Sequence, residues 1–415
     1  MSLFGFREQT FSNTINVPIQ IIARDVRDLC YGVENSKIRQ NLNLMKPYKW
    51  VSHLQGKMNI NAERPQSEFM ATSDEVYVIG DLHGDLTVLL AILMALGIID
   101  QDYKLVNQEA KVFCLGDQLD GGRQYHQLPD RADPERTIQD FSYPNEEIWL
   151  LQIMEYYAIH GLIGNHELMR IEKEVGYCSP TQVCDWDKHW PNVLRWYLAT
   201  RFPAAIAVKH EGGHVKLLMH TFPGMKGSSL KQFLQSLEGR LQEQNLMEYL
   251  NNAAFSYCLK GHTDSYKTFY EALWGRDVVA GKGCDGVDNF VEKCGLDPGQ
   301  TIAMIGHSIT KYNQNNNKCQ EKQKTKVYSA DKGMSKAFLQ VPAIQRSVHY
   351  GGVVNGQTPH ERKWAAELDK QDRHLICFRL SKQTAEPIYI TNQSVAEEKP
   401  VAEKKPVDNM QRLTI

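Results

Sequence analysis

The sequence lacks the features of a membrane protein, a nucleic-acid-binding protein or a secreted protein. No apolar run approaches the roughly 18–20 residues of a membrane-spanning helix. Lysine and arginine total 47 against 49 aspartate and glutamate residues, so the net charge of −2 includes no basic excess for nucleic acid. The chain also begins without the basic segment and long apolar stretch of a secretory signal. We therefore expect neither a membrane nor a nucleic acid as a partner.

The cysteines lack both an even count and closely spaced pairs. Nine cysteines are scattered along the chain, which is typical of a reducing compartment and predicts a cytoplasmic location. Cys178, Cys184 and His189 could contribute to a zinc site, but a fourth ligand and the CxxC spacing of structural zinc are absent. We therefore interpret the cysteines as ordinary surface and core thiols.

The chain does contain enough apolar residues for a full core. Its 415 residues are 42% hydrophobic, which suits one large domain or two smaller ones. Residues 1–70 carry no recognisable motif, and we predict that they form a helical N-terminal extension packed on a catalytic domain at 71–392. The last segment, 393–415, holds a tandem hexapeptide rich in glutamate, lysine and proline. Because such a segment cannot bury a core, we predict that it is disordered.

Five short apolar runs are each followed by residue types that bind metal ions. The runs lie at 76–79, 111–115, 159–163, 217–219 and 301–305. Such runs are typical of buried strands, and ligands of open α/β sheets bind beyond the carboxyl ends of strands. The polar residues that follow the runs are Asp81, His83, Asp117, Asn165, His220 and His307. Two carboxylates, an amide and three imidazoles that converge there would hold two divalent ions, an arrangement that suits phosphoryl chemistry.

Helical patterns alternate with these strands, which predicts an α/β sandwich. Asp85 can cap a helix at 86–99, and a second helix is expected at 145–157. A turn centred on Gly212 predicts a hairpin at 204–219. Further strands are expected at 327–330, 374–380 and 387–391, and long loops at 123–143 and 313–324.

The spacing of the ligands suggests how two ions would share them. Asp81 and His83 are two positions apart on one loop, so both can reach one ion. Asp117 has two oxygens and can bridge both ions, while His220 and His307 would complete the coordination of the second ion. Manganese, iron and zinc accept imidazole as well as oxygen ligands, so we predict one of these metals, with manganese supporting activity in vitro.

The expected chemistry is the hydrolysis of a phosphate ester. A water that bridges two cations loses a proton readily, and the resulting hydroxide could attack phosphorus without a covalent intermediate. The leaving alkoxide needs a proton, and His166, which directly follows Asn165, is the expected general acid. Asp120 could hold that imidazole in its charged form. Each motif alone would be weak, since Gly-Asp and Gly-Asn are also turn dipeptides, but five such strand ends in order are not expected by chance.

At these residues the chain resembles the calcineurin-like metallophosphoesterases, and in particular the phosphoprotein phosphatase family. The family pattern of GDxHG, GDxVDRG, GNHE and two separate histidines corresponds here to 80–84, 116–122, 164–167, His220 and His307. The resemblance spans about residues 75–334. It implies a four-layer α/β/β/α sandwich, two metal ions held by the six ligands named above, and an acid role for His166 paired with Asp120.

Two further segments are similar to bacterial and Shewanella-like members of the family. LWGRD at 273–277 resembles their Trp-x-Arg segment, whose arginine contacts phosphate, so the resemblance implies that role for Arg276. DKGMS at 331–335 resembles the DxGMS run that follows the last histidine.

Two departures from the family pattern lie on the substrate side. The DRG of the second motif is DGG at 120–122, so one phosphate-binding arginine is missing. Arg123 could replace it or could be an ordinary loop residue. The Gly-Gly that usually follows the fourth ligand is Thr221-Phe222. Both changes bear on the substrate and the rate more than on metal binding.

Three functions are compatible with these motifs. The first is a protein phosphatase that acts on phosphoserine, phosphothreonine or phosphotyrosine. The second is a small-molecule phosphohydrolase, for example one that cleaves dinucleoside polyphosphates, and the third is a non-catalytic binding protein built on a phosphatase fold. The presence of all six ligands together with His166 and Asp120 favours an enzyme.

Overall fold

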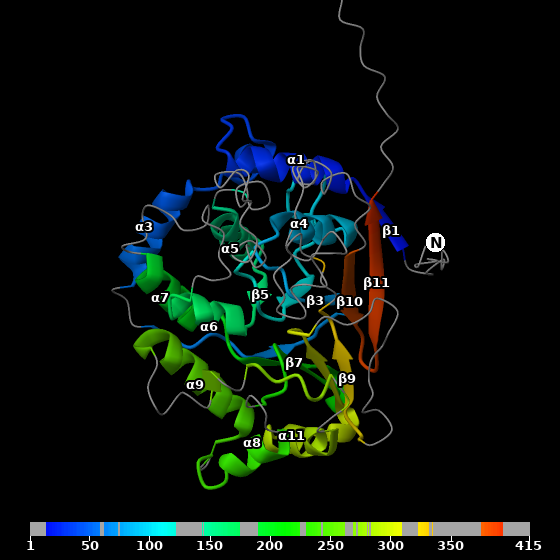
Figure 1. The fold of residues 1–415 in the computed structure, drawn as a ribbon. Coiled ribbons are helices and arrows are strands. Elements are labelled where there is room, and N and C mark those ends of the chain that lie inside the picture. Colours follow the sequence, from blue (N-terminus) through cyan, green and yellow to red (C-terminus); the bar gives the residue numbers. More distant parts are fainter. Residues whose placement is uncertain are drawn as a thin grey trace, which may run out of the picture.

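The computed structural model describes fifteen parts of the chain: residues 14–58, 62–73, 75–121, 143, 145–174, 190–224, 230–241, 244–261, 269–270, 273–279, 281, 284–308, 323–331, 334 and 375–392. They form two β-sheets flanked by helices, which confirms the predicted α/β sandwich (Figure 1). The predicted loop at 123–143, apart from Tyr143, lies outside these residues, as do the cysteines and histidine considered for zinc and the tail at 393–415.

The first sheet has six strands and carries three of the predicted strand ends. Its order is β1 (Thr14–Val17), β11 (Ala385–Asn392), β10 (Leu375–Leu380), β3 (Val76–Ile79), β4 (Lys111–Cys114) and β5 (His160–Gly161). Strands β3, β4 and β5 are parallel, so their carboxyl ends meet at one edge of the sheet. Strand β5 is shorter than predicted: it pairs with β4 only at His160 and Gly161, followed by one further bond from the N–H of Leu162 to the carbonyl of Cys114.

The second sheet has five strands and carries the other two strand ends. Its order is β2 (Glu68–Met70), β6 (Ala205–Lys209), β7 (Val215–Met219), β8 (Thr301–Ile305) and β9 (Lys326–Ser329). The predicted hairpin is confirmed: β6 and β7 are antiparallel and join through a short 3-10 turn, η3 (Glu211–Gly213). Strands β7, β8 and β9 are parallel, which again brings their carboxyl ends together.

Helices cover the outer faces of both sheets. Their bounds are α1 (Ile19–Cys30), α2 (Lys37–Leu42), α3 (Pro47–Lys57), α4 (Leu86–Ala95), α5 (Glu146–Tyr156), α6 (Asn165–Ile171), α7 (Trp190–Arg201), α8 (Leu230–Ser236), α9 (Leu246–Lys260) and α11 (Val287–Lys293), with 3-10 turns η4 (Cys284–Gly286) and η5 (Pro298–Gln300). Figure 1 shows α4 and α5 on the side of the first sheet, and α8 and α11 beyond the second. Among the described residues, no helix is long and apolar enough to span a membrane.

Helix α4 links the first metal-binding motif to the core. Asp85 caps it as predicted, its Oδ1 accepting from the N–H of Val88 at 3.2 Å. The first eight residues of the helix, Leu86 to Leu93, are all buried. The helix ends at Ala95 and not at 99, because Gly97 has a left-handed backbone (φ 64°) that stops it.

The segment before residue 70 contributes more than helices. Strand β1 pairs in parallel with β11, and β2 pairs in parallel with β6, so the segment supplies an edge strand to each sheet. Helix α1 joins the common core through Ile22 and Val26, both fully buried. The hydroxyl of Tyr103 donates to Asp25 Oδ2 at 2.8 Å. The division at residue 70 stays a prediction, but residues 14–58 pack directly on the rest of the protein.

The cysteines follow the predicted pattern with one exception. Five described cysteines are free and buried: Cys30, Cys114, Cys258, Cys294 and Cys377. Cys284 is disulfide-bonded, which the scattered spacing did not predict.

We expect the substitution Ile22→Ala to destabilise the whole protein. Ile22 is 0% exposed on α1, so its truncation leaves a core cavity and should lower the free energy of unfolding by about 2–5 kcal/mol. Its neighbour Ile21 is 37% exposed, and Ile21→Ala should change stability by only about 0.5 kcal/mol. Denaturant unfolding of both variants measures the difference; equal and small effects would mean that α1 does not belong to the core.

Candidate metal centre

The predicted metal-binding residues meet where the carboxyl ends of the parallel strands of the two sheets face one another. The carbonyl of Asp117 accepts the N–H groups of Leu82 (3.1 Å) and His83 (2.8 Å), joining the ends of β3 and β4. In the second sheet the N–H of Gly306 donates to the carbonyl of His220 at 2.9 Å. Eight predicted residues are no more than 4% exposed: Asp81, His83, Asp117, Asp120, Asn165, His166, His220 and His307.

Asp117 lies between two groups of potential ligands. The first comprises His83, Asp117 and His166, and the second comprises Asp117, His220 and His307; within each group, one ligand atom per residue lies within 4.8 Å of the others. The two carboxylate oxygens face different groups. Asp117 Oδ2 is 3.9 Å from the Nε2 atoms of both His83 and His166, whereas Oδ1 is 3.4 Å from His220 Nε2. This is the geometry expected of a carboxylate that bridges two ions.

Backbone carbonyls orient two of the imidazoles. The Nδ1–H of His220 donates to the carbonyl of Leu115 at 2.8 Å, and that of His83 donates to the carbonyl of Leu119 at 3.3 Å. Each histidine therefore presents the lone pair of Nε2 to the interior, as metal-ligating histidines do. His220 Nε2 is 3.0 Å from Asn165 Oδ1 and 3.2 Å from His307 Nδ1. A cation would be well accommodated among these closely spaced lone pairs, so the donor set fits a divalent metal.

Asp81 contacts a residue of the second group. Its Oδ1 and Oδ2 accept the backbone N–H of His307 at 3.2 and 3.0 Å. This contact ties the first motif to the last strand end. A ligand role for Asp81 stays a prediction, since it lies outside both groups among the described residues.

His166 and Asp120 are in contact, as the sequence predicted. The Nδ1–H of His166 donates to Asp120 Oδ2 at 2.9 Å, and both side chains are fully buried. The carboxylate can therefore orient the imidazole. Its other oxygen, Oδ1, is 3.2 Å from a guanidinium nitrogen of Arg170, a partner that the sequence did not predict.

Glu167 is a second residue that sequence reasoning missed. Its Oε2 accepts the N–H groups of Gly164 and Asp117 at 2.8 and 2.9 Å, and its Oε1 accepts those of Gln118 and Leu119 at 2.8 and 3.0 Å. One carboxylate thus shapes the second and third motifs together. Burial, followed by the charge of Asp117, raises the pKa of Glu167, and the N–H donors oppose this rise. Its place as the last residue of GNHE was the signal available in the sequence.

Charge and burial shift the pKa of the central aspartate in opposite directions. Burial raises the pKa of Asp117, but the nearby histidines, His220 first among them, outweigh burial and hold that pKa below its usual range. Burial lowers the pKa of His220. The site therefore favours an ionised aspartate and a neutral imidazole, the forms in which these residues bind metals.

The backbone of the site is held in an uncommon conformation. His83, Asp117, Asp120 and His307 have φ values of 44°, 50°, 67° and 62°, in the left-handed region that residues other than glycine rarely adopt. Such strain is typical of functional positions that surrounding structure holds in place.

Arg276 lies near the second group. Its charge contributes to lowering the pKa of His220, and its side chain is exposed. The neighbouring Trp274 ring meets that of His307 edge-on, with centroids 6.0 Å apart. The hydroxyl of Thr221 donates to the carbonyl of Gly275, so the residue that replaces a family glycine anchors this segment. Arg123 lies outside the described residues.

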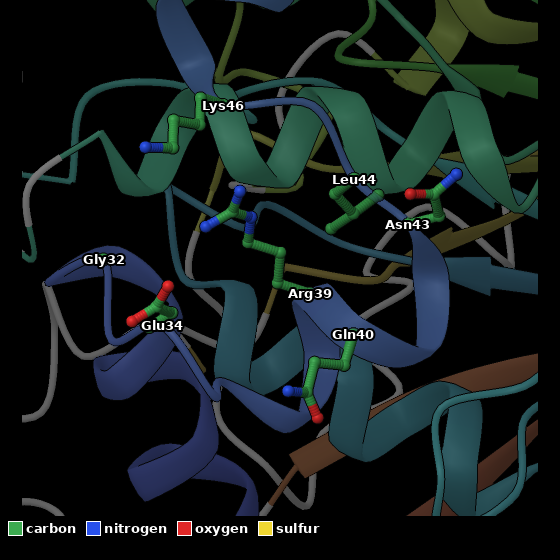
Figure 2. Close-up of a pocket in the computed structure, with 7 residues that line it drawn as sticks. All are labelled: Gly32, Glu34, Arg39, Gln40, Asn43, Leu44 and Lys46. Atoms are coloured by element: carbon green, nitrogen blue, oxygen red, sulfur yellow. The ribbon is translucent and has the colours of Figure 1, made fainter.

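A cavity of about 500 Å³ lies elsewhere, at the N-terminal helices (Figure 2). It is lined by Gly32, Glu34, Arg39, Gln40, Asn43, Leu44 and Lys46. None of the predicted site residues contributes to it, so the metal centre and this cavity are separate.

We expect Gly306→Ala to disturb the metal centre while leaving the fold intact. A Cβ atom at position 306 would overlap Asp81 Oδ1, and the carboxylate would have to move. Metal content, measured by mass spectrometry after loading with manganese, should fall. Gly56→Ala is the control, because a Cβ there meets no atom within 4 Å; unchanged metal content in Gly306→Ala would show that Asp81 is not a ligand.

Comparison with known proteins agrees with the geometry. Residues 75–236 match the family model of the calcineurin-like phosphoesterases. A comparison with curated proteins gave no match. Similar solved structures include a cold-active protein tyrosine phosphatase (14% identity over 78% of this chain and 81% of that one, TM-score 0.44) and the corresponding enzyme of a psychrophilic Shewanella species (14%, 79% and 83%, TM-score 0.36).

Another similar structure is that of a protein provisionally named a diadenosine tetraphosphatase, at 9% identity over 79% of this chain and 99% of that one, with a TM-score of 0.33. Likenesses this distant carry no argument about the substrate, so the assignment depends on the family match and on the buried ligand groups. Residues 75–236 therefore form a calcineurin-like phosphoesterase domain, and its buried ligand groups suit the metal-dependent hydrolysis of phosphoric esters.

Proposed function

We propose that the protein holds two divalent ions and hydrolyses phosphate monoesters on the serine, threonine or tyrosine side chains of proteins. The observation that carries the proposal is the position of Asp117, whose two oxygens face separate groups of histidines. A single ion would need only one of these groups. We infer that Asp81, His83, Asp117, Asn165, His220 and His307 are the ligands, and that the metals are manganese, iron or zinc.

The protein residues would then divide the remaining work. When bound, two such ions supply Lewis acidity and a water of lowered pKa. His166 would donate the proton from its Nε2 to the leaving oxygen, because its Nδ1–H is engaged by Asp120. Arg276 would bind phosphoryl oxygens with its charged guanidinium.

The choice of a protein substrate is supported by the segments that resemble Shewanella-like members. The DKGMS run at 331–335 begins beside the first motif, since a Cβ at Gly80 would lie only 3.0 Å from Asp331 Cα. Asp331 and Met334 are each 2% exposed. Asp331 therefore packs against the first motif, and Met334 is buried beside strand β10.

We also propose a cytoplasmic location. Five free, buried thiols support a reducing compartment, and the disulfide at Cys284 weighs against it. Mass spectrometry of thiol-alkylated protein from the native host would decide this.

The function is tested by assaying metal-loaded protein on three ester classes: phosphopeptides, an aryl phosphate and dinucleoside polyphosphates. We expect a chelator to abolish phosphopeptide hydrolysis and manganese to restore it. Activity confined to the dinucleoside polyphosphates would replace the proposal with a small-molecule phosphohydrolase. Stoichiometric metal without hydrolysis of any ester would favour a binding protein.

We expect Asp117→Asn to remove both ions. A neutral amide attracts each cation less strongly, and Asp117 is the only residue that the two groups of described side chains share. Mass spectrometry should find less than one ion per chain, whereas the exposed Asp102→Asn control should retain two. Loss of a single ion would remove Asp117 from the bridging position.

We expect His166→Asn and Arg276→Ala to fail in different ways. Loss of the general acid should lower kcat by about 10²–10⁴-fold for a phosphoserine peptide, and much less for an aryl phosphate whose leaving group needs little protonation. Loss of Arg276 should raise KM and weaken inhibition by inorganic phosphate for both substrates alike. The exposed His53→Asn and Arg240→Ala variants are the matched controls. Equal kcat losses on both substrates for His166→Asn would contradict the acid role.

A further inference from the structure

We propose that Arg170 and Glu147 form a positioning pair that holds Asp120 against His166. This inference rests on the proposed function, because it concerns the residue expected to protonate the leaving group. Neither residue belongs to a motif that the sequence singled out. Both are buried, at 8% and 3% exposure, directly behind the His166–Asp120 contact.

Helix α6 presents His166 and Arg170 to the same carboxylate. The two residues are four positions apart, so their side chains project from one face of the helix. His166 Nδ1 meets Asp120 Oδ2 at 2.9 Å, and Arg170 Nη1 meets Asp120 Oδ1 at 3.2 Å. Each oxygen of Asp120 thus has its own partner, and rotation of the carboxylate would break both contacts.

Glu147 on α5 holds both the guanidinium and the backbone of the loop. Its Oε2 is 3.0 Å from Arg170 Nη2. Its Oε1 accepts the N–H of Asp120 at 2.6 Å and that of Gly121 at 3.3 Å. Because Asp120 has the left-handed φ of 67°, these bonds hold a backbone conformation that the residue does not favour by itself.

The charges of this network suit a positioning role. Arginine stays protonated under all ordinary conditions, so one permanent positive charge lies between two buried carboxylates. That charge attracts both carboxylates and so holds the Asp120 side chain in place beside Glu147. Two different guanidinium nitrogens make the two contacts, and a lysine ammonium cannot reproduce such a fork.

The network also bears on the missing family arginine. Gly121 follows Asp120 where the family pattern has arginine, and Arg170 supplies a cation beside Asp120 from α6.

A purely structural ion pair is the competing interpretation. Buried ion pairs often contribute little net stability, so the two interpretations differ in what their loss does to catalysis.

The test compares Arg170→Met and Arg170→Lys with Asp120→Asn, alone and combined, in metal-loaded protein. For a phosphoserine peptide we expect Arg170→Met to lower kcat by about 10–100-fold with little change in KM, and Arg170→Lys to recover only part of the loss. For an aryl phosphate the loss should be several-fold smaller. In the Asp120→Asn background, Arg170→Met should cause no further loss, because its effect passes through Asp120.

A second measurement does not depend on activity. The Nδ1 proton of His166 in its carboxylate hydrogen bond should give a downfield proton resonance in histidine-labelled protein. We expect Arg170→Met to shift or broaden this resonance, as Asp120→Asn does. Arg201→Met removes an exposed pair with Glu155 (3.1 Å) and is the matched control, which should change neither the resonance nor kcat.

A second variant guards against misfolding. Arg170→Met leaves two carboxylates without their shared cation. If this single variant does not fold, the double variant Glu147→Gln, Arg170→Met is used in its place. Metal content should remain at two ions in every variant used. Losses that multiply in the Asp120→Asn background, equal losses on both substrates, or an unchanged His166 resonance would overturn the inference. A wild-type protein inactive on every ester would overturn the proposed function, and the resonance would still test the positioning of His166.

Discussion

The rest of the site depends on the contacts of Asp117. Its carboxylate oxygens face two groups of histidines, and its backbone carbonyl accepts N–H groups from the first motif. Its own N–H donates to Glu167, which also binds the start of the third motif. Four histidines surround this buried carboxylate, and they hold its pKa below its usual range. The three motif loops are therefore arranged around a single residue, Asp117.

A site of this kind needs a stiff surrounding structure. Four of its residues hold left-handed backbone conformations, and eight of its side chains are almost completely buried. The rigidity comes from parallel strands on both sides, from the fully packed helix α4, and from the edge strands β1 and β2. Residues near the start of the chain thus support a site whose proposed ligands all lie after residue 80. We infer that Arg170 and Glu147 extend the same support to the proposed acid.

Much of the fold could be predicted because its strands are short, apolar and bounded by motifs. Strands β3 and β8 have the predicted bounds, and the hairpin of β6 and β7 and the cap at Asp85 were also predicted correctly. Strands β1 and β2 were not predicted, because they have four and three residues and pair with strands far along the chain. Helix α4 is shorter than its apolar pattern because the left-handed backbone of Gly97 ends it, and the pairing of strand β5 with β4 stops at Gly161.

The sequence by itself determined which chemical groups follow each strand and in what order, because local patterns of apolar runs, glycines and ligand residues encode strand ends. Only the tertiary structure decided how those groups face one another. It placed Asp81 against the backbone of His307, which is 226 positions away. It also brought Glu147, Asp120 and Arg170 from three separate segments into one network. Such contacts depend on how the two sheets and their helices pack, and no spacing within a motif records that packing.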